Sequence, residues 1–145
     1  MAAHINEATQ LDALVPQIGP SVPLWTFCAV LLAFTFKHFV ADFMLQTSWI
    51  AHGKERIEGW FWPLAVHVLC HAALTLIIAL IVAPHLWWLA LVDLFIHASI
   101  DRGKSGMGHW GGWKPTDGAF WWLMGFDQFL HHVTNIGLTA ALFVL

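Results

Sequence analysis

The stretch that decides the fold is FWPLAVHVLCHAALTLIIALIV, residues 61–82. It contains no Asp, Glu, Lys or Arg, and about 20 apolar residues suffice for a helix to cross a bilayer. Its two imidazoles, His67 and His71, stand four positions apart, so in a helix they lie one above the other on the same face. The stretch predicts a membrane-spanning helix with one polar face.

Three further apolar runs surround this stretch. They cover residues 22–46, residues 85–101 after the break at Pro84, and residues 119–145. A polar loop at 52–59 and a Gly-rich loop at 102–118 separate them. The chain is 59% hydrophobic and only 10% charged, which is typical of membrane proteins and not of soluble domains. We therefore predict an all-α fold: a single integral membrane four-helix bundle at 22–145, preceded by a short amphipathic or irregular tail at 1–21.

Each of the four runs carries one pair of metal-ligand residues at i and i+4. The pairs are His38/Asp42, His67/His71, His97/Asp101 and Asp127/His131. Each pair points in one direction from its helix, so four pairs predict a shared polar site at the centre of the bundle. Ionisable residues inside a membrane are costly and indicate function.

The basic residues predict the orientation of the bundle. All but one lie in the first and third loops: Lys54, Arg56, Arg102, Lys104 and Lys114. The positive-inside rule therefore places both loops in the cytoplasm. The four pairs lie at the same end of their runs, which puts the site near the cytoplasmic face. The remaining basic residue, Lys37, is expected to snorkel to that interface. The net charge of -3 and the lack of a basic patch argue against nucleic acid as a partner.

Five imidazoles and three carboxylates are more ligands than one tetrahedral zinc requires. They suit two metals, or one metal whose histidines are oriented by carboxylates. We expect all eight residues to be metal ligands, and the mixed His/Asp set favours zinc, with iron or manganese as alternatives. A bound divalent metal activates water, so Asp42, Asp101 and Asp127 are the predicted catalytic residues, as ligand or general base.

Other polar residues are expected at a similar depth in the membrane. Lys54 and Lys104 are expected to bind an anionic head group at the interface. Asp93 precedes His97 by one helical turn and is expected to hydrogen-bond a ligand imidazole.

Residues 36–47, FKHFVADFMLQT, with Trp49, Ala51 and Lys54 after them, resemble the opening signature of the domain-of-unknown-function 3307 family. Shorter similarities follow at His67-x-x-x-His71 with Thr75, at His97-x-x-x-Asp101-x-x-Lys104, and at Asp127-Gln128-x-x-His131. The likeness extends over about 34–136. It implies a small multi-span protein of the bacterial inner membrane and no particular activity. A looser similarity to membrane-bound metal-dependent hydrolases is an analogy only.

Three functions follow as hypotheses. The first is a metal-dependent hydrolase that acts on a membrane lipid or other amphiphile at the cytoplasmic interface. The alternative is a non-catalytic accessory subunit of a larger membrane protein complex, in which the His/Asp cluster is structural. A proton or metal-ion transporter is a third hypothesis. It is disfavoured because the polar groups gather at one end of the spans.

Overall fold

The computed structural model describes residues 22–145, and every regular element within that range is helical. The elements are α2 (Leu24–Phe39), the π-helix η1 (Val40–Met44), α3 (Ser48–Lys54), α4 (Phe61–Val82), the 3-10 helix η2 (Pro84–Leu86), α5 (Leu89–Gly111) and α6 (Gly118–Val144). The predicted all-α fold is thereby confirmed for this range. The predicted tail at 1–21 lies outside the described residues.

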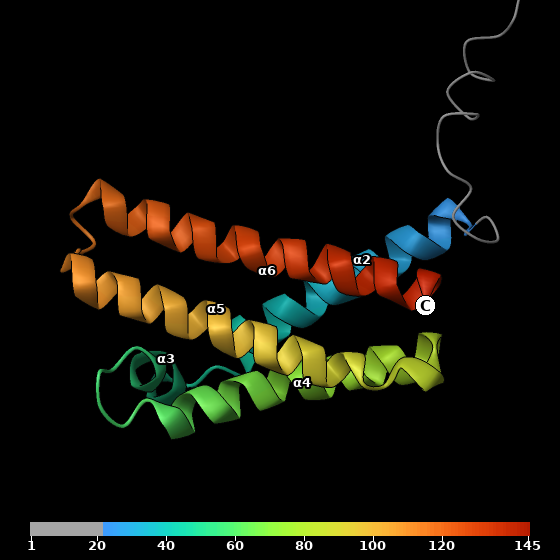
Figure 1. Ribbon diagram of the computed structural model, residues 1–145, viewed down its shortest axis with the longest axis horizontal. Coiled ribbons are helices and arrows are strands. Elements are labelled where there is room, and N and C mark those ends of the chain that lie inside the picture. The colour runs from blue at the N-terminus through green and yellow to red at the C-terminus, as the bar shows by residue number, and fades with distance from the viewer. Residues whose placement is uncertain (1–21) are drawn as a thin grey trace, which may run out of the picture.

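Four long helices run lengthwise beside one another, and the short helix α3 packs at one end (Figure 1). α2 contacts α4 and α6, and α5 contacts the same two helices. The four helices therefore close a ring around a common axis. α3 contacts α4 and α5 and covers the end of the bundle where α4 begins. Side chains on the inner faces of four different helices can thus meet on the axis.

Two predicted loops are partly helical. α5 does not stop at Asp101 but continues to Gly111, and it starts at Leu89 rather than at His85. It ends where Gly112 adopts a left-handed φ of 62°, a conformation that glycine takes at helix C-termini without steric cost. The predicted polar loop at 52–59 overlaps the end of α3. This helix is capped by Thr47, whose Oγ1 accepts a hydrogen bond from the Ile50 amide.

The interior of the bundle has two zones. The end near η2 and the C-terminus holds a buried apolar cluster: Val30, Phe34, Ala79, Ala83, Leu86, Leu89, Leu138 and Leu142. The rest of the interior is rich in polar groups, and the buried polar side chains are Lys37, His38, Lys54, His67, His71, Thr75, Asp93, His97, Asp101, Ser105, Asp127, His131, Asn135 and Thr139. Such a concentration of buried ionisable groups is unusual, because burying a charge is costly unless it is paired.

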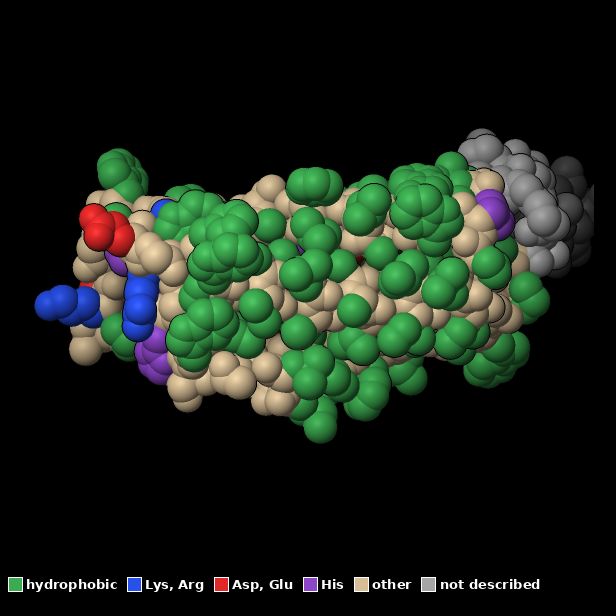
Figure 2. Space-filling model, turned by 90° about the horizontal axis from the view of Figure 1, so that it is seen from below, with side chains coloured by type: hydrophobic (Ala, Val, Ile, Leu, Met, Phe, Trp, Pro, Cys, Tyr) green, Lys and Arg blue, Asp and Glu red, His purple; other side chains and the backbone are tan. Residues whose placement is uncertain are grey.

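The outer surface of the bundle is apolar, in contrast to its partly polar interior. Figure 2 shows hydrophobic side chains along the whole flank of the bundle, while Lys, Arg, Asp and Glu gather at one end. Leu69, Phe95 and Ile81 are 56%, 69% and 76% exposed. Two helices in the described range, Leu24–Met44 and Phe61–Val82, are long and apolar enough to cross a membrane.

Candidate metal centre and its cavity

The first potential metal site joins three helices. It consists of Asp42, His67, His71 and His97, each of which offers one ligand atom within 4.8 Å of the others. Asp42 Oδ1 lies 3.0 Å from His71 Nε2 and 3.4 Å from His67 Nε2. His67 Nε2 lies 3.3 Å from His97 Nε2. Ligand atoms at about 2.0–2.1 Å from a tetrahedral zinc are roughly 3.3 Å apart, so the spacing fits a metal.

A second potential site adjoins the first and is formed by Asp101, Asp127 and His131. His131 Nε2 lies 3.2 Å from Asp101 Oδ1 and 3.6 Å from Asp127 Oδ1. A third grouping, made of His38, His97 and His131, overlaps both neighbours. The three groups together contain all eight residues singled out by the sequence. The buried His/Asp cluster could hold a metal ion.

The π-helical turn η1 carries Asp42 to the cluster. Leu45 N bonds to Val40 O, a five-residue step that widens the helix at this point. His38 Nε2 nevertheless lies 3.1 Å from Asp42 Oδ2. Single π-turns are rare and are frequently found at functional sites. The apolar pattern of residues 22–46 predicts a regular helix here and carries no sign of this turn.

Lys54 joins the cluster, a position that its place in a predicted loop did not indicate. Its Nζ donates to Asp101 Oδ2 at 2.7 Å and to His67 Nε2 at 2.9 Å, and its side chain is buried. Contact of Lys54 with a head group therefore stays a prediction, since its ammonium is engaged by His67 and Asp101 in the structure described. α3 folds back over the bundle end and directs the ammonium inward, between the two potential metal sites.

Lys37 also departs from its prediction. It does not snorkel but donates to Asp93 Oδ2 at 2.6 Å and to Thr75 Oγ1 at 3.0 Å. Thr75 Oγ1 in turn donates to the same oxygen of Asp93 at 2.6 Å. Asp93 therefore pairs with Lys37 and not with an imidazole. The sequence did indicate that Thr75 and Asp93 lie near each other. Thr75 follows His71 by one helical turn, and Asp93 precedes His97 by one turn, so both lie on the faces that carry the cluster.

Lys104 lies beyond the metal groups, on the part of α5 that extends past Asp101. Its Nζ is 2.9 Å from Glu55 Oε1 and 3.7 Å from Asp127 Oδ2. Burial alone lowers the pKa of Lys104, but the charges of Asp127 and Glu55 outweigh it, and the net effect is a raised pKa. Lys104 is thus held as an ammonium beside the cluster.

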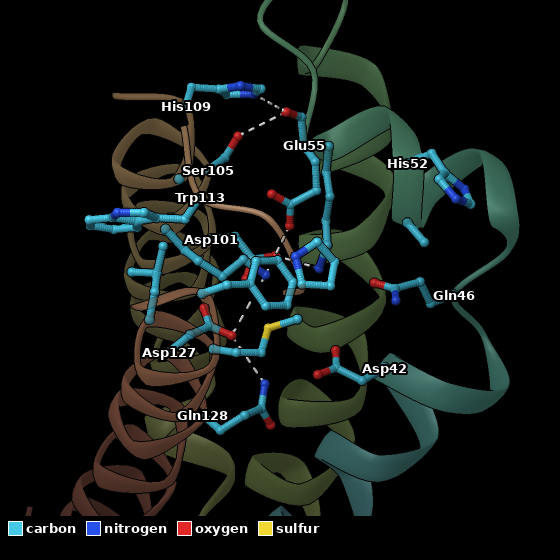
Figure 3. A pocket seen from close by; sticks show the side chains of 18 of the residues that line it. Asp42, Gln46, His52, Glu55, Asp101, Ser105, His109, Trp113, Asp127 and Gln128 are labelled. Atoms are coloured by element: carbon cyan, nitrogen blue, oxygen red, sulfur yellow. Dashed lines mark hydrogen bonds and ion pairs between the residues drawn. The ribbon is translucent and has the colours of Figure 1, made fainter. Parts of the chain in front are cut away.

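A cavity of about 720 Å³ opens between α3, α5 and α6 and reaches the cluster (Figure 3). Asp42, Asp101 and Asp127 line the part of it nearest the bundle, with Asp42 and Asp127 on opposite sides. Lys54 and Lys104 also line it. Its apolar lining comes largely from α6 and the segment before it: Trp113, Pro115, Phe120, Leu123 and Met124. The volume falls within the range of small-molecule sites.

Exposed histidines mark the limits of the cluster. His52, His85, His109 and His132 are exposed and belong to none of the three potential metal groups. His52 Nδ1 bonds to the Ser48 carbonyl of its own helix.

The profile of the family described as protein of unknown function (DUF3307) matches residues 30–145. The chain belongs to this family. The similarity predicted from the sequence is thereby confirmed, and all eight clustered His and Asp residues of this DUF3307 chain lie within the matched range. No curated protein and no solved structure gave a significant match.

Proposed function

We propose that this chain is a four-span integral membrane protein with a metal-dependent hydrolase site for a lipid or other amphiphile near the cytoplasmic face. The observation that carries the proposal is the cavity: it is amphipathic, and three carboxylates of the potential metal sites line it. A purely structural metal site is expected to be closed, whereas a catalytic site keeps open access for substrate.

The charges around the cluster support a bound cation. Asp42, Asp101, Asp127 and Glu55 supply four negative charges, and Lys54 and Lys104 supply two positive ones. With neutral histidines the balance is two negative charges, which one divalent ion offsets. Asp127 Oδ1 is buried and accepts no hydrogen bond from the described residues, so it is available to a metal. Zinc suits the His/Asp donors best, with iron and manganese as alternatives.

The same residues supply acid–base chemistry. A bound divalent metal polarises water and the substrate oxygen. Asp42, Asp101 and Asp127 border the cavity, so a carboxylate that is not engaged as a ligand can accept a proton from the attacking water and return it to the leaving group.

The distribution of polarity supports a membrane location. A polar interior within an apolar exterior is the arrangement expected of a bundle surrounded by lipid. α5 and α6 carry charged groups that lower their mean hydropathy, but Asp93, Asp101 and Asp127 are buried and face other helices. We propose that both helices also span, in the bacterial inner membrane. Lys and Arg concentrate at the α3 end, which the positive-inside rule assigns to the cytoplasm.

The alternative functions are less well supported. An accessory subunit with a structural cluster remains the second candidate, and the extensive apolar surface would suit it, but the cavity beside the carboxylates has no role there. A transporter needs a polar path to the opposite face. The buried polar residues of the interior end at Thr75 and Thr139. Beyond them the interior is filled by the apolar cluster, which includes Ala79 and Leu142, so within the described range no polar path continues to the other end.

Metal analysis of gently purified protein tests the proposal. We expect about one or more equivalents of zinc, iron or manganese in the wild type, and loss of the metal in a His67→Ala/His71→Ala variant. His85→Ala and His132→Ala, which change exposed imidazoles, should retain it. A wild type without stoichiometric metal would support the accessory-subunit alternative.

A further inference from the structure

We infer that the site holds two divalent metal ions and that its substrate is a phosphate monoester of an amphiphile. This inference rests on the proposed function and specifies both the number of metals and the substrate class. It is derived from the arrangement of the ligand groups, from their charge, and from the cavity, which has both a charged and an apolar lining.

The ligand groups can serve two metals at once because they are disjoint. Asp42, His67, His71 and His97 form one group, and Asp101, Asp127 and His131 form another, with no residue in common. A single metal would leave one of the two groups uncoordinated. His38 lies between the groups, beside Asp42 and within ligand-atom reach of His97 and His131.

The two groups are adjacent. His67 Nε2 of the first group lies 3.3 Å from Asp101 Oδ2 of the second. The ring centroids of His97 and His131 are 4.1 Å apart. Two-metal sites have ions about 3.5–4 Å apart, a separation compatible with groups in direct contact. The Lys54 ammonium lies at this junction and supplies positive charge between His67 and Asp101.

The charge balance favours an anionic substrate. One divalent ion brings the surroundings of the cavity to neutrality, and a second leaves an excess of two positive charges. A phosphate monoester carries about −1.5 to −2 charges near pH 7 and matches that excess. A neutral carboxylic ester would leave it without a counter-charge.

Lys54 would change partners when metal binds. His67 Nε2 can bind a metal only if its lone pair is released from the Lys54 ammonium. Lys54 already lines the cavity together with Lys104, so the freed ammonium is placed to bind a phosphate oxygen. The apolar lining beside Phe120, Leu123 and Met124 would hold the hydrocarbon chain of the substrate.

The reaction is hydrolysis, with water as the only co-reactant. The oxygen of water forms a bond to phosphorus, and the bond between phosphorus and the ester oxygen breaks with its electron pair on that oxygen. A proton taken from the water by Glu55, the cavity carboxylate that belongs to neither ligand group, passes to the departing oxygen. The products are the alcohol and inorganic phosphate.

Metal stoichiometry tests the two-metal part. We expect two equivalents in the wild type, one after His71→Ala, which alters the first group, and one after Asp127→Ala, which alters the second. One equivalent in a fully loaded wild type, or none in either variant, would overturn the two-metal inference. The metal-binding proposal would survive the first of these results.

Three probes test the substrate class with zinc-loaded protein in detergent: dodecyl phosphate, glycerol phosphate and dodecyl acetate. We expect phosphate release from dodecyl phosphate at least about tenfold faster than from glycerol phosphate, because burial of the chain contributes binding. Hydrolysis of the acetate alone would overturn the substrate class but keep the hydrolase. Equal rates for both phosphates would overturn the amphiphile part. No hydrolysis of any probe by the loaded protein would contradict both the substrate class and the hydrolase.

Binding of inorganic phosphate tests Lys54 independently of turnover. Lys54→Met should retain two metals and weaken phosphate binding about tenfold or more, the effect of losing a charged hydrogen bond. Lys54→Arg should restore much of the affinity, and Lys114→Met, an exposed control, should not change it. Unchanged phosphate affinity in the Lys54→Met protein, or loss of its metals, would overturn the role given to Lys54.

Discussion

The ion pair between Lys37 and Asp93 lies one helical turn further into the bundle than the metal groups. Both side chains are almost fully buried, at 3% and 1% exposure, and Thr75 contacts both. Removing one charge from such a pair leaves the other uncompensated, whereas replacing both by apolar groups is often nearly neutral. The pair therefore stabilises the bundle only in the sense that losing one partner leaves the other as an unpaired buried charge.

Double-mutant analysis can measure this coupling. We predict that Lys37→Met and Asp93→Leu each destabilise the bundle by roughly 3–5 kcal/mol, and that the double variant recovers most of the loss. Equilibrium unfolding in detergent would report the three free energies. Additive losses in the double variant would contradict the stabilising role of the pair.

Residue spacing predicted which ligand-type side chains meet, but it did not predict their cationic partners. The i, i+4 rule fixes the face that His67 and His71 share within one helix. The partners of Lys37 and Lys54 belong to other helices, and they depend on how each helix is rotated and on where α3 returns. Neither quantity is encoded in local periodicity.

At the scale of elements, α3 is positioned by close packing on the first turn of α4. A Cβ at Gly53 would collide with the ring of Pro63, so only glycine allows this approach. Gly53 directly precedes Lys54. The contact between α3 and α4 therefore determines where the Lys54 ammonium lies.

We predict that Gly53→Ala displaces α3 and speeds amide hydrogen exchange over Ser48–Lys54, with weaker contact between Lys54 and the cluster. The matched control is Gly106→Ala on α5, where an added Cβ meets nothing within 4 Å. That control should be neutral or stabilise by about 0.5–1 kcal/mol, the helix preference of alanine over glycine. Equal exchange in both variants would rule out the positioning role of Gly53.

The extension of α5 shows why the Gly-rich segment was predicted as a loop. Glycine disfavours helix by about 1 kcal/mol per residue, and Gly103, Gly106 and Gly108 all lie within the extension. Tertiary contacts outweigh this cost. Ser105 Oγ donates to the Glu55 carbonyl at 3.1 Å, and the Arg102 guanidinium lies 4.3 Å from the Trp60 ring centroid. Composition alone does not reveal such contacts.

At the scale of the whole molecule, the apolar exterior makes a prediction that distinguishes lipid from water. Leu69 and Trp62 are both exposed on α4, but Leu69 is near the middle of the helix and Trp62 is at its start. In a bilayer, Leu69→Lys should cost up to about 3 kcal/mol and Trp62→Lys much less. Membrane-fraction yield and thermal stability of the two variants would measure the difference. Equal tolerance of both would contradict a lipid-facing surface.

The order of apolar runs was sufficient to predict the helical fold and the convergence of the pairs. The bounds of α4 coincide with the predicted run, because Gly59, with a left-handed φ of 71°, lies just before it and Pro84 just after it. The cavity was not predictable, since it depends on α3 and on the segment around Trp113, neither of which has a distinctive pattern.

X-ray absorption spectroscopy of the purified protein, at the edge of whichever metal it contains, tests the metal centre most directly. We predict a first shell of nitrogen and oxygen only, at about 2.0–2.2 Å for zinc, with outer-shell scattering from imidazole rings. That scattering should weaken in the His67→Ala/His71→Ala variant. A shell containing sulfur at about 2.3 Å, or a wild type without bound metal, would contradict the assignment of the His/Asp cluster as the metal site.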